Sequence, residues 1–316
     1  MSFSIVVCAY LDDRAKNAIR GSAGNDCVDF VDRESLTRDQ LGPLAEAEVI
    51  FGNVSVRHLP SCRRLKWLQL ESVGFEYYLP LTDTPPSFSI TNLKGMFEWP
   101  TAETALSGLL ALGRGLPQLL TAQAQSQWVE LEVRPQTWLL HGQRALVIGA
   151  GSIGNRLRLL LEAFGCQVQS FARSNPAADF HTIPELLNAI PQYDIVACCL
   201  PKTPETIGLV NRKMLEAMSA RALFVNIGRG AVVDEAALIG VLQRRRIRGA
   251  VIDVTQSEPL APDHPLWRCP RTIITQHTGG GYDDELLDKA RFFLRNLDLY
   301  RRGAELLNPI DVRKGY

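Results

Sequence analysis

The sequence lacks an excess of charge of either sign. Its 316 residues include 34 Lys and Arg and 34 Asp and Glu, so the formal net charge is zero. A protein without a net charge has no global field that would draw it to nucleic acid or to an anionic membrane surface. The composition therefore predicts a small-molecule partner, with no nucleic acid and no membrane.

Long apolar runs, a leader segment and metal-ligand spacings are also missing. No run reaches the roughly 18 apolar residues that a membrane span needs. Residues 4–9 are apolar but have no basic leader before them, so we expect a first strand there and not a signal peptide. The seven cysteines show no C-x-x-C spacing and the histidines do not cluster, so we expect a cytoplasmic protein with reduced thiols and no metal site.

What the sequence has is a regular alternation of strand-like and helix-like segments from about residue 145 onward. Near-continuous apolar strands separated by Leu- and Ala-rich stretches indicate βα units and a parallel sheet covered on both faces. The segment therefore predicts a doubly wound α/β domain. Its expected strands are 145–148, 168–171, 194–200, 222–227, 249–254 and 272–275.

The first ninety-odd residues repeat this pattern and predict a second, smaller α/β domain, with strands at 5–8, 49–51, 67–70 and 87–90. Between the two domains Pro100 breaks the pattern, and Thr101 is expected to cap a long helix that runs to about residue 124. If the amphipathic stretch 285–300 packs back on the first domain, the chain crosses twice and forms a cleft. The expected domains are residues 1–98 with 286–316, and residues 99–285.

One run of like charge, Arg244-Arg245-Arg246, raises the possibility of a nucleic-acid contact. The run ends a predicted helix, where cations complement the helix dipole. We interpret it as a solvated helix end.

A glycine-rich turn, Gly149-Ala150-Gly151-Ser152-Ile153-Gly154, follows the strand at 145–148 and opens a helical stretch. In a dinucleotide-binding turn the first glycine permits the tight turn, the second lets the backbone approach the pyrophosphate, and the third allows close helix packing. The helix N-terminus favours the anion. The turn predicts a Rossmann domain.

The acid that usually holds the adenosine ribose is absent from the next strand, which ends in Ala172-Arg173-Ser174. Without a carboxylate, nothing repels a 2′-phosphate, and the Arg173 guanidinium and the Ser174 hydroxyl are suited to bind one. The sequence therefore predicts NADP(H) as the preferred cofactor, with NAD(H) possible. The alternative, an ordinary surface arginine at position 173, stays open.

Three groups suited to carbonyl chemistry, Arg229, Glu258 and His277, each follow a predicted strand. The carboxyl ends of parallel strands line one ligand crevice, so these groups are expected to meet there. A cation, a carboxylate and an imidazole together polarise a carbonyl, bind a carboxylate and move a proton. The sequence thus predicts carbonyl reduction with a nicotinamide cofactor.

Taken in order, these motifs resemble the D-isomer-specific 2-hydroxyacid dehydrogenases over nearly the whole chain. The resemblance is densest in residues 140–154, 200–206, 225–235, 249–254 and 258–260 and at His277. The residues Ala172-Arg173-Ser174 are most similar to the glyoxylate/hydroxypyruvate reductase branch. The resemblance implies a Rossmann cofactor domain, a smaller flavodoxin-like substrate domain and a cleft between them.

The resemblance also implies a role for each site residue. Arg229 would bind the substrate carboxylate and carbonyl oxygen, His277 would donate the proton, and Glu258 would hold the imidazolium. Asp253 would receive the nicotinamide carboxamide. The implied cofactor-binding residues are Gly149, Gly151, Ser152, Ile153, Gly154, Arg173, Ser174, Leu200, Pro201, Thr206, Ile227, Gly228, Arg229, Asp253, His277 and Gly279. The implied substrate-binding residues are Ser72, Val73, Gly74, Arg229 and Trp267.

The chain departs from the family at several positions near the site. Gln276 stands where proline usually precedes the histidine, and Thr278-Gly279-Gly280-Gly281 replaces the usual residues after it. Glu76 and Thr255 stand where Asp and Phe are frequent. These departures put the shape of the pocket and the substrate preference in question.

The long helix from Thr101 and the segment 263–267 resemble the family's dimer elements, so a homodimer is expected. Two other functions stay open at this point. One is NAD-dependent oxidation of a 2-hydroxy acid, of the phosphoglycerate dehydrogenase type. The other is a non-enzymatic, dinucleotide-sensing protein similar to the C-terminal-binding corepressors.

Overall fold

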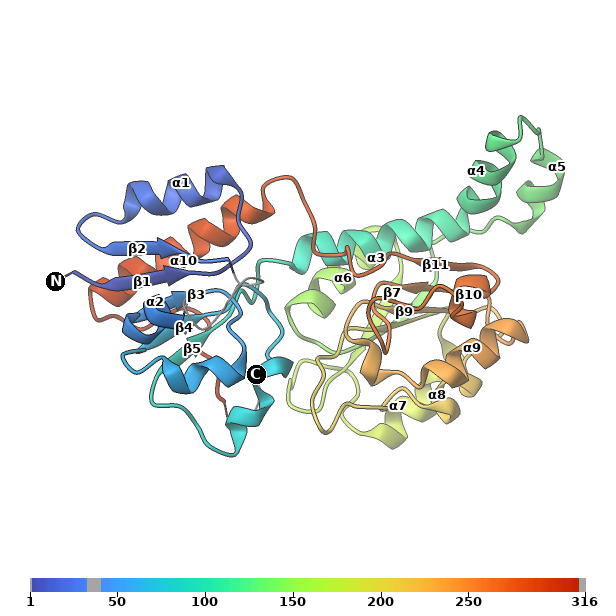
Figure 1. Ribbon diagram of the computed structural model, residues 1–316. Helices are drawn as coiled ribbons and strands as arrows, with labels where there is room; N and C mark the ends of the chain where they lie inside the picture. Colours follow the sequence, from blue (N-terminus) through green and yellow to red (C-terminus); the bar gives the residue numbers. More distant parts are fainter. Residues whose placement is uncertain (1, 33–40, 313–316) are drawn as a thin grey trace. The chain divides into compact units, whose positions relative to one another are not determined.

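The computed structural model describes residues 2–32 and 41–312 (Figure 1). The chain divides into two compact units, Met1–Met96 with Tyr282–Tyr316, and Phe97–Gly281. We call the first the terminal unit, because it holds both chain ends, and the second the central unit.

The central unit is built on a six-stranded parallel sheet with the order β11-β10-β9-β8-β6-β7. Because β7 lies on one side of β6 and β8 on the other, the order reverses at β6, and ligands bind at such a switch point. The glycine turn follows β6 directly. The strands are β6 Arg144–Ile148, β7 Gln167–Phe171, β8 Ile195–Cys198, β9 Leu223–Asn226, β10 Gly249–Ile252 and β11 Thr272–Ile274.

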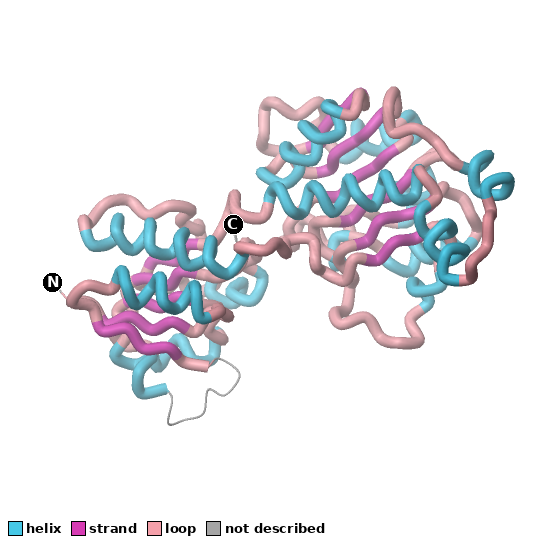
Figure 2. Tube along the Cα trace, turned by 90° about the horizontal axis from the view of Figure 1, so that it is seen from above, coloured by secondary structure: helices cyan, strands magenta, loops and turns pink. Residues whose placement is uncertain are grey.

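Helices cover both faces of this sheet (Figure 2). Two helices pack on one face, α3 Glu98–Gly113 and α6 Ser152–Ala163, and three on the other, α7 Ile183–Ala189, α8 Arg212–Ala217 and α9 Glu235–Gln243. A strand covered on both sides buries all its side chains, which explains the near-continuous apolar runs. The shorter helices α4 Leu116–Ala124 and α5 Glu130–Val133 project from the end of α3 (Figure 1).

The terminal unit has a five-stranded parallel sheet with the order β2-β1-β3-β4-β5, the flavodoxin-like order. Its α10 returns to this sheet, where Phe293 stacks on Phe51 at 4.6 Å and Asn296 donates to Gln69 at 2.9 Å. The predicted fold class is confirmed. The elements are β1 Ser4–Val7, β2 Cys27–Phe30, β3 Val49–Phe51, β4 Trp67–Gln69, β5 Ser89–Thr91, α1 Asp13–Ser22, α2 Leu41–Glu46 and α10 Glu285–Arg301.

The predicted single helix from Thr101 to about residue 124 is wrong. The helix α3 already begins at Glu98, since Pro100 in the first turn removes an N–H that has no helical partner there. Thr101 is buried inside α3 and does not cap it. Gly115, with a φ of +68°, separates α3 from α4.

Sequence patterns also missed β2, and they placed the end of β8 at residue 200, two residues beyond Cys198. β2 is a four-residue edge strand with a half-exposed pattern, which carries little apolar signal. None of the helices in the described ranges is long and apolar enough to span a bilayer.

Candidate active site

Arg229, Glu258 and His277 follow the ends of β9, β10 and β11, which are three neighbouring strands of the central sheet. Their loops therefore lie along one edge of the sheet. Gly230 explains how two of these loops fit together, because a Cβ atom there would lie 1.9 Å from the carbonyl oxygen of Thr255. Only glycine lets the loop of Arg229 pack directly on the segment that leads to Glu258.

The carboxylate of Glu258 is held from two sides. Its Oε1 accepts the backbone N–H of Thr255 at 2.9 Å, and its Oε2 lies 2.6 Å from Nδ1 of His277. A carboxylate at Nδ1 favours the proton on that nitrogen, which leaves Nε2 for a second partner. The His277 side chain is 49% exposed, so a ligand has access to the ring.

The backbone at His277 has an unusual conformation. Gln276 and His277 have φ values of +53° and +58°, in the left-handed region. Here the chain turns back, and the His277 N–H donates to the carbonyl oxygen of Asp253 at 2.6 Å. Proline fixes φ near −65°, so proline does not fit at position 276 in this loop.

Asp253 is almost fully buried at the end of β10. A buried carboxylate needs donors, and Oδ1 of Asp253 accepts the Thr275 hydroxyl at 2.5 Å and the Gly279 N–H at 3.1 Å. These two bonds join the loops after β10 and β11.

A second acid–imidazole pair, Glu235 and His264, stabilises the loop that leads to Glu258, and the sequence analysis did not predict it. Oε2 of Glu235 accepts the Gln256 N–H at 2.9 Å, and Oε1 lies 3.4 Å from Nε2 of His264. Glu235 belongs to the motif at 225–235, but its spacing gives no sign of a bond to the loop after β10.

The glycine turn after β6 fits a dinucleotide. Gly149 has a φ of +113°, and a Cβ atom on Gly154 would lie 1.9 Å from the Gly149 carbonyl oxygen. Around Gly151, the N-cap of α6, no atom lies within 4 Å of an added Cβ, and no side chain caps the helix. The first N–H groups of α6, which include Ser152 and Ile153, are therefore suited to an anion.

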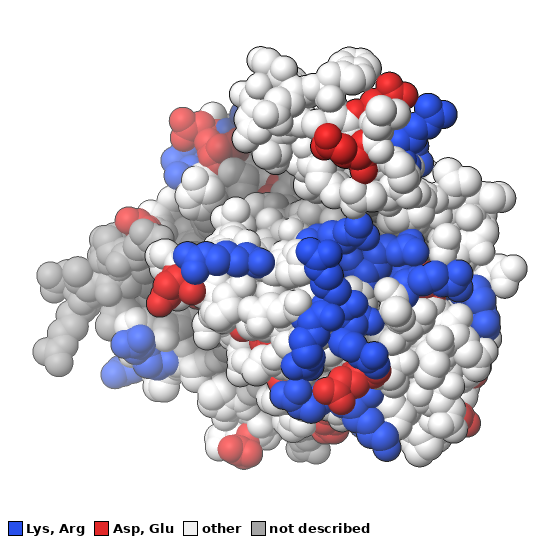
Figure 3. Space-filling view, turned by 90° about the vertical axis from the view of Figure 1, so that its right-hand side faces the viewer, with Lys and Arg blue, Asp and Glu red and all other residues white. Residues whose placement is uncertain are grey.

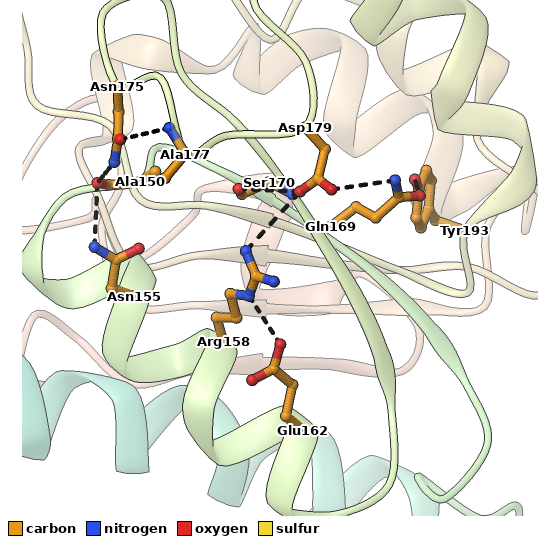
Figure 4. Close-up of polar contacts among 10 residues, drawn as sticks. All are labelled: Ala150, Asn155, Arg158, Glu162, Gln169, Ser170, Asn175, Ala177, Asp179 and Tyr193. Carbon is orange, nitrogen blue, oxygen red and sulfur yellow. Dashed lines mark hydrogen bonds and ion pairs between the residues drawn. The ribbon is translucent and has the colours of Figure 1, made fainter.

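The loop after β7 folds back on the strand (Figure 4). Asp179 accepts the Ser170 N–H at 2.8 Å and lies 3.9 Å from Arg158, while the Asn175 amide donates to the Ala150 carbonyl oxygen at 3.2 Å. The acid nearest in sequence is thus engaged with β7 itself. Arg173 and Ser174 are exposed, and no carboxylate of the described chain makes an ion pair with Arg173.

Two of the other predicted site residues have local structural contacts. Thr206 is buried, donates to the Pro201 carbonyl oxygen at 2.6 Å and accepts the Thr203 N–H at 2.8 Å, so its hydroxyl holds the turn after Leu200. Trp267 is 40% exposed, and its indole N–H donates to Ala261.

The loop Ser72-Val73-Gly74 lies in the terminal unit. Asn53 bonds to the Ser72 hydroxyl at 3.2 Å, and Asn92 donates to the Val73 carbonyl oxygen at 2.8 Å. These bonds fix the loop. Across residues 2–32 and 41–312, no group of three or more His, Cys, Asp or Glu is placed to hold a metal ion.

Comparisons with known proteins identify the relatives of the chain. The family model of the NAD binding domain of D-isomer specific 2-hydroxyacid dehydrogenases matches residues 106–279. Glyoxylate/hydroxypyruvate reductase A of Arabidopsis thaliana is 29% identical over 70% of this chain and 70% of its own length. Glyoxylate reductase of Aeropyrum pernix is 29% identical over 78% of this chain and 76% of its own length.

Solved structures agree with these relatives. A D-isomer specific 2-hydroxyacid dehydrogenase family protein of Aeromonas salmonicida superposes with a TM-score of 0.84 at 27% identity, covering 98% of both chains. A D-isomer specific 2-hydroxyacid dehydrogenase of Xanthobacter autotrophicus, in complex with NADPH and MES, superposes with a TM-score of 0.83 at 26% identity, covering 100% of both chains.

Proposed function

Because the chain belongs to the D-isomer specific 2-hydroxyacid dehydrogenase family, we propose that it reduces a small 2-oxo acid, of the glyoxylate or hydroxypyruvate type, to the 2-hydroxy acid. Membership makes the chain an oxidoreductase that binds a nicotinamide dinucleotide. The observation that carries the proposal is the bond between His277 and Glu258, at the sheet edge that also presents Arg229.

In the proposed reaction the bound nicotinamide supplies the hydride. His277 donates a proton from Nε2 to the substrate oxygen, because Nδ1 is engaged by Glu258. The carboxylate stabilises the imidazolium before the transfer and orients the neutral ring after it. Arg229 binds the substrate carboxylate and stabilises the charge that develops on the carbonyl oxygen.

Asp253 is proposed to receive the nicotinamide carboxamide. The Thr275 and Gly279 donors orient its carboxylate, which supports this role. The pyrophosphate is proposed to lie at the N-terminus of α6, where Gly151, Ser152 and Ile153 present the backbone. Leu200, Pro201, Ile227 and Gly228 remain predicted cofactor contacts, and Ser72, Val73, Gly74 and Trp267 remain predicted substrate contacts.

NADPH is the proposed cofactor. Ala172 puts no charge at the end of β7, Arg173 is exposed beside it, and Asp179 is engaged by Ser170. These features leave the Arg173 guanidinium without an ion pair in the described chain, although it interacts electrostatically with the exposed Glu205, and so suited to a 2′-phosphate. The Xanthobacter autotrophicus relative was solved with NADPH, which supports the same choice.

We also propose that the protein is a homodimer. The projecting helices α4 and α5, and the residues between them, have large apolar side chains that are exposed to solvent. Trp128 is 89% exposed and Leu131 is 86% exposed. Several exposed large apolar side chains in one short region favour a protein partner. A second copy of the chain is the partner that the resemblance predicts.

The test of the proposed reaction is a screen of cofactor oxidation with glyoxylate, hydroxypyruvate, pyruvate and hydroxyphenylpyruvate, using NADPH and NADH in parallel. We expect turnover with glyoxylate, hydroxypyruvate or both, and its loss in His277→Asn. If NADPH binds but no 2-oxo acid is reduced, the chain is not a reductase of this type.

A further inference from the structure

Arginines line the edge of the central sheet that lies opposite the candidate active site. Arg271, Arg248 and Arg221 come just before β11, β10 and β9, which are neighbours in the sheet, and Arg144 begins β6. The one acid in this row is Asp194, which precedes β8 and lies 3.7 Å from Arg221. Figure 3 shows a continuous band of Lys and Arg on this side of the unit.

The whole chain has a net charge of zero. The band is therefore a local concentration of positive charge and not part of a general excess. The run Arg244–Arg246, at the end of α9, precedes Arg248 by two residues. The function proposed above uses none of these side chains.

A cavity of about 150 Å³ opens at this edge, between the start of β10 and β11 and the turn from α3 to α4. Arg248 and Arg271 line it together with Gln136, Trp138 and Leu223. We call it the edge pocket. A cavity of this size is well below the roughly 300 Å³ of ordinary cofactor pockets, so it admits only a small group.

The two arginines of the edge pocket are held in place by neutral groups. Arg271 donates to the Gln136 side-chain oxygen at 2.7 Å, and the Arg248 guanidinium lies over the Trp138 ring at 5.3 Å from the centroid. Neither makes an ion pair with a carboxylate in the described part of the chain.

Burial, and next to it the charges of Arg221 and Arg271, lower the pKa of Arg248, while Asp194 raises it. Arg248 and Arg271 line the same small cavity, so their like charges repel each other. A bound anion would relieve this repulsion.

We propose that the edge pocket binds a phosphate-class oxyanion, either inorganic phosphate or the phosphoryl group of a small phosphomonoester. Planar guanidinium groups bind the oxygens of such anions in pairs. The pocket lies at the amino ends of the strands, whereas the glycine turn and His277 follow their carboxyl ends. It is therefore a second anion site, separate from the dinucleotide site.

The test uses the full chain saturated with NADPH, so that the dinucleotide site is filled. Inorganic phosphate and glycerol 3-phosphate are titrated separately by calorimetry at constant ionic strength, because salt screens exposed charges. The variant is Arg248→Gln with Arg271→Gln. Its matched control is Arg245→Gln with Arg246→Gln, which removes the same charge from exposed residues outside the edge pocket.

We expect the parent and the control to bind at least one of the two anions, and the pocket variant to bind it about tenfold more weakly or worse, the loss that removing charge-assisted bonds produces. Stronger binding of glycerol 3-phosphate identifies a phosphomonoester site, and stronger binding of phosphate identifies a free-anion site. Equal affinity in the parent and the pocket variant, or no binding by the parent, overturns the proposal.

A thermal melt and the NADPH affinity of each variant show whether it is folded. If the double variant does not fold, Arg271→Gln alone is measured, since Arg271 is exposed and the only hydrogen bond of its side chain in the described part of the protein is to Gln136. Unchanged anion affinity in that variant overturns the proposal equally. All these readouts are binding constants, so they do not depend on the proposed reaction.

Discussion

Glu258 and His277 form a bond of 2.6 Å between Oε2 and Nδ1, and the other oxygen of Glu258 is fixed by the Thr255 N–H. The carboxylate is therefore held at both of its oxygens. The orientation of the His277 ring, in the loop after β11, therefore depends on the backbone N–H of Thr255, in the loop after β10.

Replacing Glu258 with Gln keeps the size of the side chain but removes its charge. We expect kcat for the preferred 2-oxo acid to fall about 10²-fold, the lower end of what general acid–base catalysis contributes, because the imidazolium loses its counter-charge. NADPH affinity, measured by fluorescence titration, should not change. The control is Glu216→Gln, on the exposed side of α8, which should have the parental kcat. An unchanged kcat in Glu258→Gln would show that the Glu258 charge does not take part in the reaction.

Replacing Arg229 with Ala should lower kcat/KM by about 10²-fold or more, since one well-placed donor to a developing oxyanion contributes about 3 kcal/mol. Binding of NADPH should survive. Arg212→Ala, an exposed arginine of α8, should have parental kinetics. Undiminished turnover in Arg229→Ala would show that Arg229 does not bind the substrate.

Cofactor preference should depend on two residues after β7. In the parent, NADPH should bind more tightly than NADH by roughly 1.5–3 kcal/mol, or about tenfold to a hundredfold, if Arg173 forms one charge-assisted pair with the 2′-phosphate. Ala172→Asp combined with Arg173→Ala should reverse or abolish the preference. The measurement is kcat/KM for both cofactors at fixed salt. A parent that favours NADH would show that Arg173 does not contact the cofactor.

Light scattering at micromolar protein should give the mass of a homodimer. Trp128→Glu with Leu131→Glu places two charges on the most exposed apolar side chains near α5, so this variant should dissociate to monomers. Tyr77→Glu changes a side chain of the terminal unit that is 79% exposed, and this variant should stay dimeric. A monomeric parent contradicts the proposal directly.

Alkaline pH should destabilise the fold partly through one thiol. Burial raises the pKa of Cys198 from 9.0 to about 11. The folded state therefore keeps a proton that the unfolded state releases, and this contribution to stability, present below pH 9, is lost as the pH rises toward 11. Urea unfolding at pH 7 and pH 10 should show a loss that is about 1 kcal/mol smaller in Cys198→Ala than in the parent. Cys27→Ala, at an exposed position, should lose as much as the parent.

The family, the fold class and most strands of the central unit were readable from the sequence, because buried parallel strands leave long apolar runs between helices. Short elements were harder to predict. The edge strand β2 has only alternate half-buried residues, and the break between α3 and α4 depends on a single left-handed glycine, Gly115. Pro117, in the first turn of α4, was the signal that could have located the start of this helix.

The candidate site divides in the same way. Residues at strand ends could be predicted, because the topology alone brings Arg229, Glu258 and His277 to one edge. The bonds that orient them could not, because they join side chains to backbone groups of other loops, as Glu235 does with Gln256 and Thr275 with Asp253. No sequence period encodes such pairs.

The left-handed backbone at Gln276 limits how this protein can be engineered from its relatives. The resemblance implies that a design following the family pattern would place proline there, and consensus substitutions are commonly stabilising. Here the ring would impose a φ of the opposite sign and displace His277, whose own N–H depends on the same turn. Residues 275–281 should therefore be exchanged together. Gln276→Pro alone would introduce proline at a position whose backbone φ it cannot adopt.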